Sequence, residues 1–115
     1  MVDRKSYVPR RGDVVKITLN PQVGHEQAGR RPALILSPEG YNRKVGLVIL
    51  CPITSRIKGY PFEVAVPNGL PVAGVILADQ VKSLDWDQRK AEWVCSLPAK
   101  AVSEVLEKLG LLLKK

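Results

Sequence analysis

Residues 24–37 read GHEQAGRRPALILS and join a loop rich in ionisable groups to a strand of the core. The loop places the only histidine of the chain, a carboxylate, an amide and two arginines between Gly24 and Pro32. The run Ala33–Ser37 that follows is short and continuously apolar, which is typical of a strand buried on both faces. The sequence therefore predicts functional side chains that are anchored directly to the core.

Further strands are predicted around this one. They are bounded by turn signals such as Asn20-Pro21 and Pro67-Asn68-Gly69 and lie at Asp13–Asn20, Val45–Thr54, Tyr60–Val66, Gly74–Val81 and Ala91–Leu97. Pro52 is expected to mark a strand edge or a bulge. Near the C-terminus the period becomes helical, and one face carries Val102, Val105, Leu106, Leu109 and Leu113. The pattern predicts a mainly β (α+β) fold, a small barrel with a C-terminal amphipathic helix, as one domain over residues 1–115. The leucines of that helix suggest a subunit interface, although additional core is an equal explanation.

The net charge of +7 is concentrated in one half of the chain. Residues 1–58 contain 11 Lys and Arg against 4 Asp and Glu, whereas residues 59–115 contain 7 of each class. A basic half of this kind favours binding to RNA, DNA or an acidic protein that mimics them, although a charge that serves solubility alone is the alternative.

Cys51 and Cys95 lie in apolar runs without paired spacing, so a zinc site is not expected and buried, reduced thiols are. No apolar run reaches the length of a membrane span, and the N-terminal residues lack the apolar core of a secretory signal. These features predict a cytoplasmic protein that does not contact a membrane.

Established catalytic spacings such as those of hydrolases, zinc proteases and nucleotide-binding loops are absent from the sequence. The remaining candidates are dispersed polar groups at strand ends. Arg31, stiffened by Pro32, offers a planar fork of donors that suits phosphate, and Thr54 ends a neighbouring strand. Asp79 interrupts an apolar run, either as a functional group or as a structural partner for an arginine. RNA cleavage through the 2′-hydroxyl needs a proton acceptor, a proton donor and positive charge, without a metal or other cofactor, and Glu26, His25, Arg31 and Thr54 could supply these.

Five segments in register resemble the MazF/PemK family of toxin endoribonucleases, from about Tyr7 to the C-terminal helix. The segments are Gly12-Asp13-Val14, Gly24–Ala33 (GHEQAGRRPA), Pro52–Ser55 (PITS), Lys58–Val64 (KGYPFEV) and Leu77–Ser83 (LADQVKS). The resemblance implies an SH3-like barrel of the PemK/CcdB type that forms a homodimer. It also implies metal-independent, sequence-specific cleavage of single-stranded RNA to 2′,3′-cyclic phosphate and 5′-hydroxyl ends.

The same resemblance implies a role in bacterial translation arrest and growth inhibition. A cognate antitoxin with an acidic C-terminal tail would neutralise the toxin, and DNA would be contacted only indirectly, through that antitoxin. The basic half of the chain would suit an acidic tail.

Carried over by position, Arg31 and Thr54 match the catalytic arginine and threonine of the family, and Glu26 matches the acidic residue beside them. Asp79 matches a residue with a base role in the PemK/Kid branch, but that branch has an arginine two residues earlier where this chain has Leu77. The mechanism based on Arg31 and Thr54 is therefore preferred. The residues expected to contact RNA are Gly24, His25, Gln27, Arg30, Ser55, Arg56, Lys58, Asp79, Gln80 and Lys82.

Two rival functions compete with this hypothesis. One is a toxin of the same fold that acts by protein binding, as CcdB-like gyrase poisons do. The other is an RNA-binding barrel without catalytic activity, which would stack bases on exposed aromatic rings. Phe62 and Trp93 alternate like core residues, and this pattern disfavours the second rival.

Overall fold

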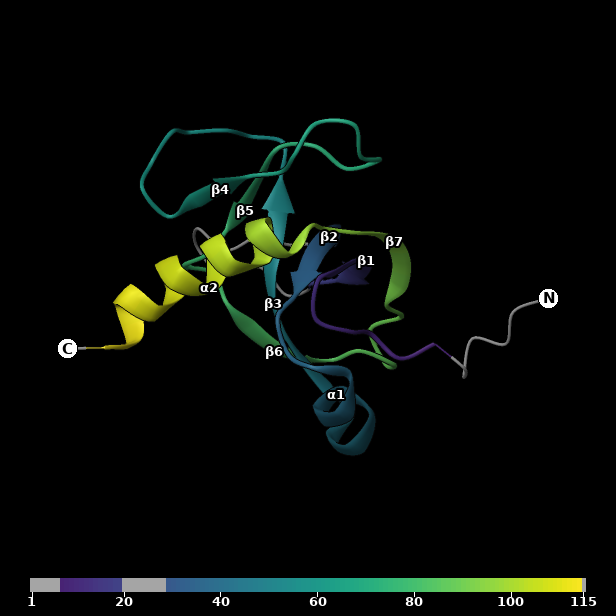
Figure 1. The fold of residues 1–115 in the computed structure, drawn as a ribbon. Coiled ribbons are helices and arrows are strands. Elements are labelled where there is room, and N and C mark those ends of the chain that lie inside the picture. Colours follow the sequence, from purple (N-terminus) through teal and green to yellow (C-terminus); the bar gives the residue numbers. More distant parts are fainter. Residues whose placement is uncertain (1–6, 20–28, 115) are drawn as a thin grey trace.

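The computed structural model describes residues 7–19 and 29–114, which form seven strands and two helices (Figure 1). Their order is β1 (Asp13–Thr18), β2 (Arg30–Ile35), α1 (Glu39–Val45), β3 (Leu47–Thr54), β4 (Glu63–Ala65), β5 (Val75–Leu77), β6 (Lys82–Asp85), β7 (Glu92–Ser96) and α2 (Ala99–Leu113). The predicted mainly β fold with a C-terminal helix is confirmed.

The strands form one antiparallel sheet in the order β4-β5-β3-β2-β1-β7, and β6 pairs with β3 outside this path. β3 is the central strand because its first half pairs with β6 and its last two residues pair with β5. Pro52 lies between these two partners, at the point where the ladder is interrupted. This is where a residue without an N–H is tolerated, as expected for a strand edge or bulge.

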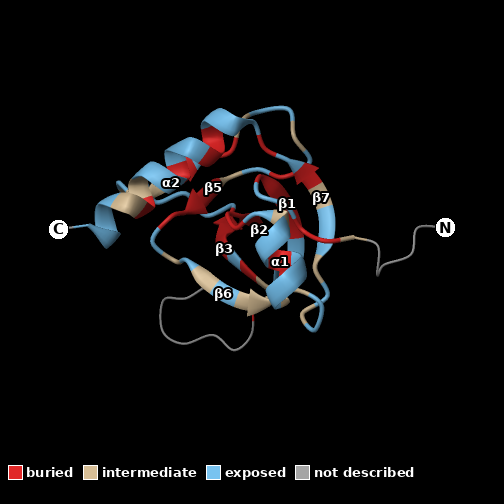
Figure 2. Cartoon of the chain, turned by 60° about the horizontal axis from the view of Figure 1, so that its bottom comes forward, coloured by how far each residue is buried: buried red, intermediate tan, exposed pale blue. Residues whose placement is uncertain are grey.

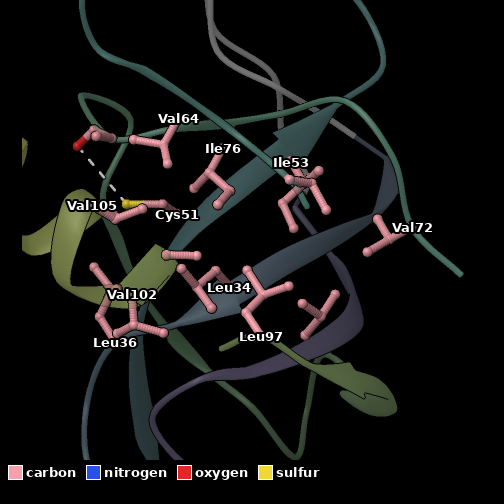
Figure 3. Packing of buried hydrophobic residues seen from close by; sticks show 14 of the residues in the cluster. Leu34, Leu36, Cys51, Ile53, Val64, Val72, Ile76, Leu97, Val102 and Val105 are labelled. Carbon is pink, nitrogen blue, oxygen red and sulfur yellow. Dashed lines mark hydrogen bonds between the residues drawn. The ribbon is translucent and has the colours of Figure 1, made fainter. Parts of the chain in front are cut away.

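Both faces of the central strands are buried, which explains why the run in β2 is continuously apolar. On one face, Leu34 and Cys51 pack beneath α2 in a cluster that also contains Val102 and Val105 (Figure 3). On the other face, a second cluster contains Val15, Ile17, Ala33, Ile35, Val48 and Leu50. Every residue of Ala33–Ser37 is buried, so the predicted burial on both faces is confirmed. The bounds differ, because β2 spans Arg30–Ile35 and includes the two arginines that were expected on the loop.

Helix α2 follows Pro98, whose extended backbone forms the N-cap, and covers one face of the sheet. Its inner side is buried through Ala101, Val102, Val105 and Leu109 (Figure 2). Leu106 and the triplet Leu111–Leu113 are exposed, so they lie outside the core of the single chain.

Two short elements were missed in the sequence. The strand predicted over Val45–Thr54 begins at Leu47 instead, because α1 spans Glu39–Val45 and ends at Gly46, whose φ of 83° is left-handed. Strand β6 was missed because its four residues are short and polar and have only partial burial. Both elements depend on tertiary packing more than on local propensity.

The expectation that Trp93 belongs to the core is wrong, since its side chain is 56% exposed. β7 is an edge strand, and its register with β1 shifts between Val14 and Val15, which pair with Cys95 and Trp93. This bulge inserts Val94 as an extra residue and breaks the simple alternation on which the prediction relied.

The two cysteines are free thiols and both are buried, as predicted. Burial, followed by the charge of Asp79, raises the pKa of Cys51 to about 12. Burial also raises the pKa of Cys95. Among the described residues, no helix is long and apolar enough to cross a membrane.

Candidate active site

Arg31 and Thr54 lie at the same edge of two neighbouring strands. β2 begins at Arg30, and the antiparallel β3 ends at Thr54, so the start of one strand meets the end of the other (Figure 1). The ladder pairs Ala33 with Pro52. The printed pairs end there, and the same register continued by two residues would set Arg31 opposite Thr54. Directly opposed residues of neighbouring strands project to the same face of the sheet. The fold therefore brings together two candidates that are far apart in the sequence.

The strand that carries Arg31 is rigid immediately beyond it. Arg31 is exposed and pairs with Ile17 on β1, whereas Ala33 and Ile35 on the same face of β2 are fully buried. Pro32 restricts the backbone between them. Arg31 is thus an exposed residue on a backbone that the core fixes.

Thr54 is held closely, with only 6% of its surface exposed. Its Oγ1 accepts a hydrogen bond from the Arg56 N–H at 3.1 Å, and its backbone pairs with Val75 of β5. A hydroxyl that accepts this bond still has its own proton to donate. The threonine can therefore act as a fixed donor at the end of β3.

The segment after Thr54 presents positive charge from a braced backbone. Ser55, Arg56 and Lys58 are exposed. The Glu63 carboxylate of β4 accepts hydrogen bonds from the Lys58 and Gly59 N–H groups at 2.9 and 2.8 Å. The loop is therefore tied to β4 through its main chain, which leaves its basic side chains directed by a fixed backbone.

The sequence predicted that Asp79 lies inside a strand over Gly74–Val81, and this is wrong. Strand β5 ends at Leu77, and Asp79 is exposed in the turn that follows. Its carboxylate accepts a hydrogen bond from the Tyr60 hydroxyl at 2.7 Å. Desolvation, this hydrogen bond and the charge of Asp79 raise the pKa of Tyr60 to about 12. The bond joins the loop after β3 to the turn after β5. Beyond that turn, Gln80 is half-buried, and Lys82 opens β6 opposite Leu50.

Arg30 has several partners within the chain. Its guanidinium donates to the Thr18 hydroxyl, to the carbonyl oxygens of Arg89 and Lys90, and to the Glu92 carboxylate at 2.6 Å. These contacts join β1, β2 and the turn before β7. The expected RNA contact of Arg30 stays a prediction, and it competes with these bonds.

Gly24, His25, Glu26 and Gln27 lie outside the described residues. Directly beside that segment, Thr18 pairs with Arg30, and the Leu19 N–H donates to the Gly29 carbonyl at 2.8 Å. The two described ends of the segment are thus joined next to Arg31.

Sequence reasoning missed Tyr60 and Glu63 as organising residues. Both lie in the motif KGYPFEV that supported the family resemblance, but no spacing rule predicts that a carboxylate four residues after a glycine will bind its N–H. The useful signal was the polar Glu63 at the start of an otherwise apolar strand.

The site contains no nucleophile of the thiol type, because Cys51 is buried with its pKa raised to about 12. Within residues 7–19 and 29–114, no three His, Cys, Asp or Glu side chains are grouped so as to hold a metal ion. The described groups are a guanidinium, a hydroxyl and exposed cations, which are suited to binding a phosphodiester and stabilising its charge.

Comparison with known proteins agrees with this description. Residues 10–113 match the family described as PemK-like, MazF-like toxin of type II toxin-antitoxin system. The chain is 50% identical over 91 residues to the endoribonuclease toxin MazF of Escherichia coli, covering 79% of each chain.

Solved structures extend the similarity to the fold. MazF of Deinococcus radiodurans is 56% identical with a TM-score of 0.91, and the match covers 94% of this chain and 98% of that one. A MazE-MazF structure from the same organism matches with 56% identity and a TM-score of 0.85, covering 94% and 97% of the two chains. The chain therefore belongs to the family of PemK-like, MazF-like toxins of type II toxin-antitoxin systems.

Proposed function

We propose that this protein is an endoribonuclease toxin that cleaves single-stranded RNA at specific sequences without a metal ion and so arrests translation. The feature that carries the proposal is that β2 begins at Arg30-Arg31 and its antiparallel neighbour β3 ends at Thr54, in a chain of this family. Relatives that are 50% and 34% identical are named endoribonucleases, MazF and PemK respectively. A gyrase-poison activity is not favoured, because a protein that acts only by binding does not require this pair.

The proposed reaction uses the RNA as its own nucleophile. The 2′-hydroxyl oxygen attacks the adjacent phosphorus, the bond from phosphorus to the 5′-oxygen breaks, and the products are a 2′,3′-cyclic phosphate and a 5′-hydroxyl. A base accepts the 2′-hydroxyl proton, and an acid donates a proton to the departing 5′-oxygen. The protein must also stabilise the charge that develops on the non-bridging oxygens.

Arg31 and Thr54 fit the charge-stabilising part of this reaction. Arg31 offers two parallel donors to a phosphate from a rigid strand. Thr54 offers its hydroxyl proton from a position fixed by packing and by the bond from Arg56. Glu26 is the third proposed catalytic residue, and Arg56, Lys58 and Lys82 are proposed to bind the RNA backbone.

The test compares the wild type with Arg31→Ala on a long single-stranded RNA in excess EDTA, with the ends mapped. We expect site-specific fragments with cyclic phosphate and 5′-hydroxyl ends from the wild type alone. Arg43→Ala is the matched control, because Arg43 is an exposed arginine on α1. Helix α1 precedes the first residue of β3, and Thr54 is the last residue of that strand. An extended strand of this length spans about 23 Å, so Arg43 lies far from the candidate site. RNA that stays intact with folded wild type, or cleavage by Arg31→Ala at the wild-type rate, would refute the assignment.

We further propose that a cognate antitoxin with an acidic tail neutralises this chain by covering the cationic edge. A relative from Deinococcus radiodurans has a solved MazE-MazF structure, which supports a partner protein of this kind. A synthetic acidic tail peptide should inhibit cleavage competitively with RNA, and more weakly as salt is raised. Inhibition that is insensitive to salt would contradict the electrostatic explanation.

A homodimer is the proposed assembly. An apolar groove of about 420 Å³ lies between α2 and the sheet and is lined by Tyr41, Ile49, Val81, Leu106 and Leu113 among others. We expect the wild type to sediment as a dimer and Leu106→Asp to sediment as a monomer. Leu111→Asp, on the same helix but outside the groove, should remain dimeric. A monomeric wild type would exclude this assembly.

A further inference from the structure

The backbone of Gly74 lies against the main chain of Thr54. A methyl group placed on Gly74 would be 2.1 Å from the Thr54 carbonyl oxygen, 2.8 Å from its carbonyl carbon and 2.9 Å from Ser55 Cα. All three distances are too short for a real contact, and each involves main-chain atoms, which cannot move aside as the end of a flexible side chain would. The φ angle of Gly74 is +116°, which also favours glycine.

Both sides of this contact are held in place by neighbouring bonds and packing. The Gly74 carbonyl accepts a hydrogen bond from the Val66 N–H at 2.9 Å, and the next residue, Val75, pairs with Thr54. Val75 and Ile53 are 4% and 1% exposed, so the strands on both sides of the contact are packed in the core. An added methyl group would therefore displace Thr54 and Ser55 relative to β2.

We propose that Gly74 is a positioning residue for RNA cleavage, because its bare Cα lets β5 seat against β3 and fixes the location of the Thr54 hydroxyl. This inference rests on the proposed function, because the role of Thr54 in RNA cleavage is part of that proposal. Gly74 itself does not touch the substrate. It sets the position of Thr54 relative to Arg31, which stands on a different strand.

The size of the effect follows from the contact distance. Relieving a separation of 2.1 Å to an ordinary contact of about 3.4 Å requires a main-chain shift of about 1.3 Å. A misplacement of about 1 Å at a catalytic group can reduce the rate by about 100-fold. We expect this loss in kcat, with a smaller change in KM, because the backbone at Lys58 and Gly59 remains bonded to the Glu63 carboxylate even when Ser55 shifts.

Gly69 provides the matched control. It lies in the same connection between β4 and β5 and has a similar left-handed φ of +90°, but an added methyl group would meet no atom within 4 Å. Gly69→Ala and Gly74→Ala therefore impose a comparable strain on the backbone, and only the second pushes on Thr54. The difference between the two variants isolates the contact.

The experiment measures kcat and KM on a fluorogenic RNA, affinity for an uncleavable RNA with a 2′-deoxy scissile nucleotide, and thermal unfolding. The proposal predicts that Gly74→Ala binds the uncleavable RNA like Gly69→Ala but cleaves about 100-fold more slowly. Thr54→Ala and the double variant Thr54→Ala/Gly74→Ala should have equal rates, because Gly74 acts through Thr54. Rates are expressed per folded molecule, with sucrose added to stabilise the variants.

The outcomes separate this inference from the proposed function. A wild type that cleaves no RNA would refute the function itself. A wild type that cleaves, with Gly74→Ala as active as Gly69→Ala, would refute only the positioning role. The positioning role is also overturned if Gly74→Ala does not fold even in sucrose, because the glycine would then serve the fold. It is overturned as well if the double variant cleaves more slowly than Thr54→Ala alone.

Discussion

Arg30 and Arg31 are adjacent on β2, and their replacement by alanine should have opposite effects. Arg30 makes four hydrogen bonds within the chain, including the ion pair with Glu92, and Arg31 is exposed at the candidate site. We expect Arg30→Ala to lower stability and to retain most of its cleavage per folded molecule, because the bonds within the chain compete with the expected RNA contact. Arg31→Ala should lose cleavage per folded molecule.

The magnitude for Arg30 follows from the setting of its bonds. Hydrogen bonds to a charged group contribute about 1.5–3 kcal/mol each when buried, but exposed ion pairs contribute about 0–1 kcal/mol. The side chain of Arg30 is 31% exposed, so water can replace part of what is lost. We therefore expect a total loss of about 2 kcal/mol. In a domain of this size that corresponds to a decrease in Tm of about 8 °C.

The assay combines two measurements. Urea unfolding is monitored by tryptophan fluorescence, and activity is measured by cleavage of a fluorogenic RNA. Arg31→Ala is expected to remain folded, and expressing its cleavage per folded molecule separates a loss of catalysis from a loss of stability. If Arg30→Ala had wild-type stability and lost cleavage, Arg30 would be an RNA-binding residue, and the structural explanation of its contacts would be wrong. Lys100→Ala, on the exposed face of α2, controls for loss of one positive charge.

Three other predictions test the packing and the titrating groups. Tyr60→Phe should cost about 1 kcal/mol at neutral pH. The pKa of Tyr60 is raised to about 12 in the folded state, so the stability that its hydroxyl contributes should be complete below about pH 10 and vanish as the pH rises through 12. If the urea midpoints of wild type and Tyr60→Phe differed equally at both pH extremes, this prediction would be contradicted. Val105→Ala removes two methyl groups from a fully buried position and should cost about 2 kcal/mol, whereas Leu111→Ala, 70% exposed, should stay within about 0.5 kcal/mol in the same urea titration. Cys51 should resist iodoacetamide at about pH 8 in the native protein and react after unfolding, because its thiol is buried and its pKa is raised to about 12; rapid native alkylation at Cys51, located by mass spectrometry, would refute this.

The long elements were predictable because their patterns are set by burial. The apolar run Ala33–Ser37 and the helical stripe with Val102 and Val105 correspond directly to buried faces. Short polar elements were not predictable in this way. Strand β6 exists because β3 offers it an edge, and that partner is not encoded in the four residues of β6 themselves. The same limit applies to Trp93, whose exposure follows from a bulge in the pairing of β7 with β1.

The candidate site illustrates what the residue types decide and what they leave open. Arg31 and Thr54 could each be identified as a polar group at a strand end, but the sequence does not state which strands are neighbours or in what register. The register of β2 and β3, with Ala33 opposite Pro52, makes the two ends coincide. A shift by one residue would place Arg31 and Thr54 on opposite faces of the sheet. That register is in turn fixed by burial of Leu34 and Ile35 on opposite faces of β2, so the geometry of the candidate site is a consequence of the two hydrophobic clusters on either side of the strand.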